Sequence, residues 1–268
     1  MAHVFYADKN PNRYANDSDE RWANQMGFVF AFMEFWNKYR IFKAFNWIPL
    51  RLANGFGAIA GKIVLKFARS FQKKLKRSFI ALFPSKMTNK DFKKFRKAYS
   101  AYLGKLVFAF MGGLTIKKTP PTTHFARYDN INLLDNELKK DRGVIIPVTH
   151  LGELTQAGWA LVNHPKKYTV ATVVYVPHMG IYKYANHPYY DNVYFYASTS
   201  FSKISSYLEA HLAQNHIVMI YYDYGHPGQY RVPFWHEKYP YLLYTPQSLI
   251  RLHKKTGASI LPCINLPD

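Results

Sequence analysis

The chain is poor in cysteine and in long apolar runs. Its single cysteine, Cys263, allows no disulfide within the chain and no cysteine-based metal cluster, so a reducing compartment is the simpler expectation. The most apolar uncharged runs are each shorter than the roughly 20 residues that a membrane-spanning helix needs. They are Leu106–Ile116, Gly143–Gly152 and Tyr168–Tyr182. We therefore expect a chain that lies on a membrane rather than one that crosses it.

Acidic residues are also scarce. The 16 Asp and Glu face 36 Lys and Arg, which gives a formal net charge of +20. Such a charge predicts an anionic partner, and nucleic acid, an anionic membrane surface, an acidic protein and a phosphorylated substrate all qualify. Aromatic residues make up 18% of the chain, with 22 Tyr and 20 Phe. Aromatic side chains of this kind favour membrane interfaces and binding surfaces.

The first part of the chain predicts helices. Residues 1–20 are polar and mixed in charge, unlike a secretory signal, and we expect a flexible tail there. Residues 21–118 contain helical patterns, and within 62–97 there are 13 Lys or Arg but one acid, Asp91. Apolar residues there recur every four positions, which predicts an apolar stripe with a basic opposite face. They are Ile63, Phe67, Phe71, Leu75 and Phe79.

Two interpretations of this stripe are open. The helix either contacts a membrane or another anionic partner, or it is an ordinary packed helix whose lysines are solvated. After Pro84, Thr88 is a plausible cap for a further helix that runs from about Asp91 to Phe110.

From residue 119 onward the pattern alternates between strands and helices. Strands are predicted at 144–148, 170–176, 193–196, 217–222 and 259–264, and helices at 153–163, 201–214 and 246–256. This alternation predicts an α/β fold with a mixed sheet flanked by helices, preceded by the helical membrane-facing portion. We expect residues 119–268 to form this core, continuous with the helical portion.

His150 is the first candidate for chemistry, because an apolar run after the turn Asp141-Arg142-Gly143 ends on it. Pro147 within that run disfavours a central, fully paired strand. Glu153 follows three positions later, where a helix is expected to begin. A carboxylate so placed can hold one imidazole nitrogen and leave the other free as a general base. The alternative is a structural histidine, with Glu153 as an ordinary acid at a helix terminus.

Several short motifs follow one another along most of the chain. They are Arg77–Pro84 (RSFIALFP), Gly143–Gly152 (GVIIPVTHLG), Val174–Pro177 (VYVP), Ile217–Asp223 (IVMIYYD), Val232–Trp235 (VPFW) and Tyr244–Pro262. Their order, after an N-terminal hydrophobic helix and a basic helix, resembles the bacterial lipid A late acyltransferases of the lysophospholipid acyltransferase superfamily.

This resemblance implies an O-acyltransferase at the cytoplasmic face of the inner membrane, held there peripherally or monotopically. The acyl donor would be an acyl carrier protein or coenzyme A thioester, and the acceptor a hydroxyl of a lipid or glycolipid such as lipid A. No other cofactor is implied. His150 would be the general base, Glu153 would orient it, and backbone amides near Gly152 or a nearby cation would stabilise the oxyanion.

The sequence departs from the family pattern at two positions. The family motif places an acid five positions after the histidine, where this chain has Thr155, so the role would pass to Glu153. Val176 stands where the family tends to have an arginine. These departures keep a second hypothesis open, in which a non-catalytic relative binds lipid or a partner enzyme.

Further candidates follow the strand predicted at 217–222. Asp223 ends that strand and is either a site residue or a turn aspartate. His226 and Arg231 either meet a phosphate of donor or acceptor, or are solvated loop residues. We expect no metal site, because neither HExxH nor paired-cysteine spacing is found. Nucleic-acid binding fits the charge but matches no recognised module, and we do not expect it.

Overall fold

The chain divides into two compact units in a computed structural model. One unit comprises residues 41–116, and the other comprises residues 1–40 and 117–268. The structure describes residues 3–6, 31, 35, 38–39, 50–82, 88–113, 128–149, 156–174, 192–197, 201–221, 230–234, 241–245 and 247–264. The sequence predicted that the helical portion ends at residue 118, which is close to this division at residue 116.

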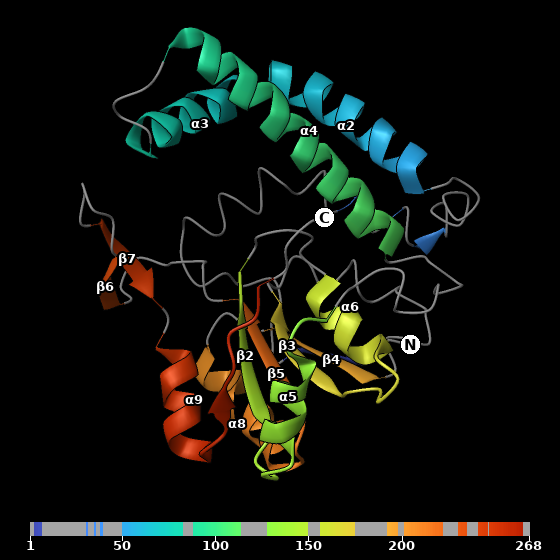
Figure 1. The fold of residues 1–268 in the computed structure, drawn as a ribbon, viewed down its shortest axis with the longest axis vertical. Coiled ribbons are helices and arrows are strands. Elements are labelled where there is room, and N and C mark those ends of the chain that lie inside the picture. Colours follow the sequence, from blue (N-terminus) through green and yellow to red (C-terminus); the bar gives the residue numbers. More distant parts are fainter. Residues whose placement is uncertain are drawn as a thin grey trace. The chain divides into compact units, whose positions relative to one another are not determined.

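The unit formed by residues 1–40 and 117–268 contains a six-stranded sheet (Figure 1). All pairs of neighbouring strands in it are parallel. The order is β1 (His3–Tyr6), β4 (Val193–Ala197), β3 (Val170–Val174), β5 (Ile217–Tyr221), β2 (Val144–Val148) and β8 (Ser259–Ile260). An α/β sheet is thus confirmed. The prediction of a mixed sheet is wrong. Crossovers rather than hairpins join the strands of this sheet, so neighbouring strands are parallel.

Two further features of this unit differ from the prediction. Strand β1 lies inside the stretch 1–20, where a flexible tail was expected. Strands β6 (Tyr230–Phe234) and β7 (Tyr241–Thr245) form a separate antiparallel pair that was not predicted. Strand β1 pairs with β4, which is distant in the sequence, and β6 pairs with β7. The residue pattern within such a short segment does not reveal its pairing partner.

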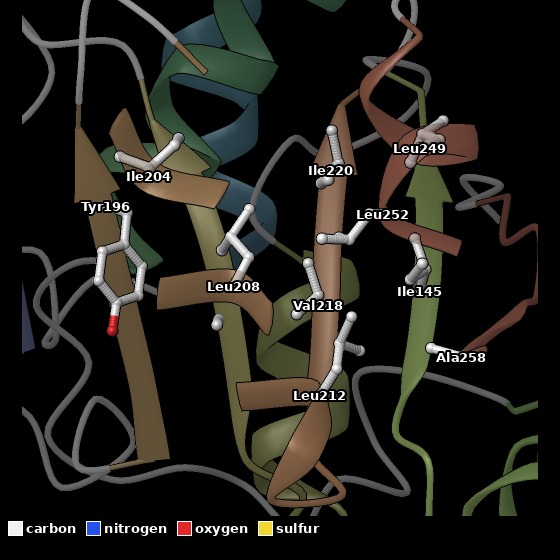
Figure 2. Close-up of a cluster of buried hydrophobic side chains, with 11 residues drawn as sticks. Ile145, Tyr196, Ile204, Leu208, Leu212, Val218, Ile220, Leu249, Leu252 and Ala258 are labelled. Atoms are coloured by element: carbon white, nitrogen blue, oxygen red, sulfur yellow. The ribbon is translucent and has the colours of Figure 1, made fainter. Parts of the chain in front are cut away.

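Helices cover both faces of the parallel sheet. On one face lie α8 (Phe201–Ala213) and α9 (Ser248–Thr256), and Leu208 of α8 and Leu252 of α9 join Ile145 and Val218 in a buried cluster (Figure 2). Because successive strand residues point to opposite faces, Met219 faces the other side. There Gly158 of α6 (Gln156–Asn163) approaches the Met219 side chain, and α5 (Ile131–Leu138) contacts β2.

Strand β2 lies inside the sheet, between β5 and β8, although Pro147 predicted otherwise. The carbonyl of Pro147 accepts a hydrogen bond from the Cys263 amide, so the missing N–H of Pro147 is also directed to the β8 side. Strand β8 ends at Ile260, before it would need that donor. The proline is thus tolerated, and β8 is shorter than the predicted 259–264.

The unit formed by residues 41–116 contains α2 (Leu50–Phe67), α3 (Arg69–Leu82) and α4 (Asn89–Gly113). Helices α2 and α4 pack closely through glycines. A Cβ atom added to Gly61 would lie 2.8 Å from the Cα of Gly104, and one added to Gly104 would meet the carbonyl oxygen of Gly57. Small residues let two helix backbones approach each other in this way.

The apolar stripe predicted for one long helix spans two helices, because α2 ends at Phe67 and α3 begins at Arg69. Gln72 stabilises the break. Its side-chain amide donates to the carbonyl oxygens of Leu65 and Lys66, at 2.8 Å and 2.6 Å, and accepts from Arg96 of α4. Along the stripe, Phe79 is buried, whereas Ile63 and Phe67 on α2 are exposed.

The cap predicted at Thr88 is confirmed. The Asp91 amide donates to the Thr88 hydroxyl at 3.3 Å, and the Asp91 carboxylate accepts from the Thr88 amide at 3.1 Å. This reciprocal pair satisfies donors at the start of α4. None of the described helices has both the length and the apolar character that a membrane-spanning helix needs.

Candidate active-site edge

The carboxyl ends of β2 and β5 are neighbours. The two strands pair in parallel along their whole length, from Val144 opposite Ile217 to Val148 opposite Tyr221. In the sequence, His150 follows Val148 by two residues and Asp223 follows Tyr221 by two residues. The sheet therefore brings together the ends of the two strands that precede these candidates.

The helices that follow these two strands along the chain lie on opposite faces of the sheet. The next helix after β2 is α6, on the face of Met219, and the next helix after β5 is α9, on the face of Ile145. Such a reversal between adjacent parallel strands opens a crevice outside their carboxyl ends, and ligands of open α/β sheets bind in such crevices. We call the carboxyl ends of β2 and β5 the switch-point edge.

Most of the residues proposed from the sequence lie outside the described residues. They are His150, Gly152, Glu153, Thr155, Asp223 and His226. Arg231 lies in β6 opposite Tyr244 of β7, and only its backbone is described. The pairing of His150 with Glu153 stays a prediction.

Thr149 adds a polar group at the switch-point edge that the sequence did not single out. It follows β2 directly, and its Oγ1 atom is buried without a hydrogen-bond partner in the described structure. A buried hydroxyl without a partner costs about 1–3 kcal/mol. The hydroxyl is therefore able to bond to a group that arrives at this edge.

A second polar cluster lies at the opposite, amino-terminal edge of the sheet. His211, in the last turn of α8, has its Nε2 atom 2.8 Å from the Tyr196 hydroxyl and its Nδ1 atom 3.0 Å from Nδ1 of His216. A neutral imidazole has one donor and one acceptor nitrogen. In either tautomer, His211 can therefore donate to one of these two neighbours and accept from the other. Because His216 immediately precedes β5, this cluster is remote from the switch-point edge.

Burial sets the protonation of this cluster. Burial, and then the neighbouring His216, lower the pKa of His211 to about 4. Burial also lowers the pKa of His216 and raises the pKa of Tyr196 to about 12. All three groups are therefore neutral at pH 7. Their arrangement stabilises the contact of α8 with the sheet and holds no charge for catalysis.

Asp135 of α5 forms a further polar contact near the start of β3. Its carboxylate accepts from Lys166 at 2.5 Å and from the Tyr168 hydroxyl at 2.6 Å. These two hydrogen bonds, Lys166 first, lower the pKa of Asp135. Both partners belong to the turn between α6 and β3, so the contact fixes α5 against that turn.

Sequence reasoning also missed a cationic hollow in the unit of residues 41–116. Lys62 of α2 meets Lys94 and Lys97 of α4 around it, and Ala98 and Ala101 complete its lining. The signal was present in the sequence, because positions 94, 97, 98 and 101 share one helix face. The partner helix was not predictable, because the Gly57–Gly104 contact brings Lys62 to that face.

The sequence matches none of the known protein-family models, and no curated protein is significantly similar to it. The resemblance to the lipid A acyltransferases is therefore carried by the motifs alone.

Proposed function

We propose that the protein is a membrane-associated acyltransferase whose reaction takes place at the switch-point edge. The observation that carries this proposal is the adjacency of the ends of β2 and β5, with Val148 opposite Tyr221. Two residues of chain reach at most about 7 Å, so His150 and Asp223 follow these neighbouring strand ends closely along the chain. The motifs around His150 supply the reaction class.

The reaction we propose is acyl transfer from a thioester to a hydroxyl. His150 takes the proton of the acceptor hydroxyl, whose oxygen attacks the thioester carbonyl carbon. The carbon–sulfur bond then breaks, the thiolate leaves and takes up a proton, and an ester is formed. Glu153 orients the imidazole, and amides near Gly152 stabilise the oxyanion. The donor is an acyl carrier protein or coenzyme A thioester, and the acceptor is a lipid or glycolipid such as lipid A.

The Thr149 hydroxyl is the described polar group nearest in sequence to His150. Thr149 immediately precedes His150 in the sequence, and its buried Oγ1 atom has no partner in the described structure. A hydroxyl in such a position can bond to the acceptor or to the imidazole.

The test is a reaction of the full chain with acyl coenzyme A or acyl carrier protein and a hydroxyl-bearing lipid in vesicles. Thiol release and the mass of the lipid are followed together. We expect both to change in proportion, with the lipid heavier by one acyl group. Thiol release without a heavier lipid would reveal hydrolysis and contradict transfer to that acceptor. Substitution Glu153→Gln should slow transfer by about 10-fold or more if the carboxylate orients the base.

A second function is a non-catalytic protein that binds lipid on the same fold. It is favoured by the exposed apolar residues of α2 beside basic side chains, and by Thr155 at the position of the family acid. Lipid binding without thiol release from either donor would support it and contradict the enzyme.

A further inference from the structure

Helix α2 exposes one apolar face along its whole length. Its members are spaced three or four apart, and each is more than half exposed. They are Leu52, Phe56, Ile59, Ile63 and Phe67, with exposed fractions of 57, 57, 56, 55 and 75%. The opposite side of α2 holds Gly57 and Gly61, which pack against α4. The face is therefore built into α2, and α4 does not cover it.

The cationic hollow is lined by Lys62 of α2 and by residues of α4. It is open to solvent and has a volume of about 300 Å³. The alanine methyl groups and the aliphatic stems of the lysines make its lining almost wholly apolar. The lysine side chains are exposed, so their ammonium groups can gather at its rim.

The hollow has little compensating negative charge. Asp91 is the single acidic residue of 41–116; its carboxylate accepts hydrogen bonds from Thr88 at the start of α4 and attracts Lys94 without forming an ion pair with it. Within the described structure, Lys62, Lys94 and Lys97 form no ion pair. Three like charges at one site repel one another, and an anion that enters relieves this repulsion.

The positions of the lysines identify the kind of anion. Lys62 follows Ile59 by three positions and Lys66 follows Ile63 by three, so a basic row runs beside the apolar face. A helix with this arrangement lies in the surface of a bilayer, with the apolar residues among the acyl chains and the lysines at the level of the phosphates. Neither a nucleic acid nor an acidic protein would need the five exposed apolar residues.

We propose that the hollow between α2 and α4 binds the phosphate group of an anionic phospholipid while the apolar face of α2 enters the bilayer surface. Lys62, Lys94 and Lys97 hold the phosphate, and the apolar lining receives the first carbons of the lipid. This site specifies the membrane contact of the proposed function and is independent of its acyl-transfer chemistry.

The test is co-sedimentation of the full chain with phosphatidylcholine vesicles, with and without phosphatidic acid. The triple variant Lys62→Gln, Lys94→Gln, Lys97→Gln is compared with Lys73→Gln, Lys74→Gln, Lys76→Gln on α3. The second variant removes the same charge from exposed positions that do not line the hollow. We expect the first variant to lose about 100-fold in affinity for the phosphatidic acid vesicles and the second about 5-fold or less. Equal losses would overturn the site, because diffuse charge would then explain binding.

Two further measurements separate this proposal from its rivals. The double variant Ile59→Ser, Ile63→Ser should also weaken vesicle binding by about 10-fold or more, because it removes exposed apolar area without altering the charge. The lipid assignment would be overturned if the protein bound an oligonucleotide or acyl carrier protein more tightly than the vesicles and if the double variant kept that tighter binding unchanged. The variant His150→Ala should bind the vesicles like the wild type, so a failure of the catalytic proposal leaves this result unaffected.

Discussion

Val148 and Tyr221, the last residues of β2 and β5, are partners in the parallel register of two neighbouring strands. The next helices along the chain, α6 after β2 and α9 after β5, lie on opposite faces of the sheet. This relationship defines the switch-point edge, and the reaction proposed for His150 depends on it.

The hydroxyl of Thr149 gives a test of that edge. Because its buried Oγ1 atom has no partner in the described structure, Thr149→Val should raise the free energy of unfolding by about 1 kcal/mol. The same substitution should slow acyl transfer if the hydroxyl bonds to the acceptor or to His150. Urea unfolding and thiol release measure the two effects.

Thr172 provides the matched control. Its Oγ1 atom is likewise buried without a partner in the described structure, but it lies in the middle of β3. Thr172→Val should stabilise by a similar amount and leave the rate of transfer unchanged. Equal rates in both variants would show that the Thr149 hydroxyl does not serve the reaction.

The glycine contact of the helical unit predicts opposite effects of one substitution at two sites. Gly104→Ala places a Cβ against the Gly57 carbonyl and 2.8 Å from the Gly61 Cα, so it should destabilise the α2–α4 pair by about 2 kcal/mol or more. Gly55→Ala meets no atom within 4 Å and should stabilise α2 by about 0.5–1 kcal/mol. Thermal unfolding followed by circular dichroism measures both. A Gly104→Ala variant as stable as the wild type would contradict the close packing.

The buried pair His211 and His216 predicts a loss of stability in acid. The pKa of His211 is lowered to about 4, so between pH 6.5 and 4 the unfolded chain binds more protons than the folded one. Above pH 6.5, His211 is neutral in both the folded and the unfolded chain and does not lower the free energy of unfolding. As the pH falls from 6.5 to 4, His211 lowers the free energy of unfolding by up to about 3 kcal/mol.

Urea unfolding at several pH values measures this slope. His211→Gln removes the titrating imidazole and should give a shallower slope between pH 6.5 and 4, even if its stability at pH 7 is lower. An identical slope in the two proteins would show that other groups cause the acid sensitivity.

The sequence predicted the elements whose signal is local. Strand β2 has the predicted bounds Val144–Val148, because an uncharged β-branched run follows a turn in which Asp141 and Gly143 have positive φ angles of 56° and 65°. The cap at Thr88 was likewise readable, because capping needs only residues three positions apart.

Other features depend on distant residues and escaped prediction. At the break after Phe67, the Gln72 side chain donates to the end of α2 and accepts a hydrogen bond from Arg96 of α4. The cationic hollow requires the contact of Gly57 with Gly104. At the candidate site, the strand ends were predictable, whereas their adjacency follows from the strand order, which the pattern of a single strand does not contain.

The most direct test of the proposed function compares His150→Ala with His164→Ala in acyl transfer from thioester to lipid. His164 lies between α6 and β3, at the amino-terminal edge of the sheet, and serves as a matched histidine outside the proposed site. We expect a rate about 10²–10⁴-fold lower for His150→Ala, with cooperative unfolding retained, and a rate near that of the wild type for His164→Ala. A His150→Ala protein that transfers acyl groups at the wild-type rate would contradict the proposed function.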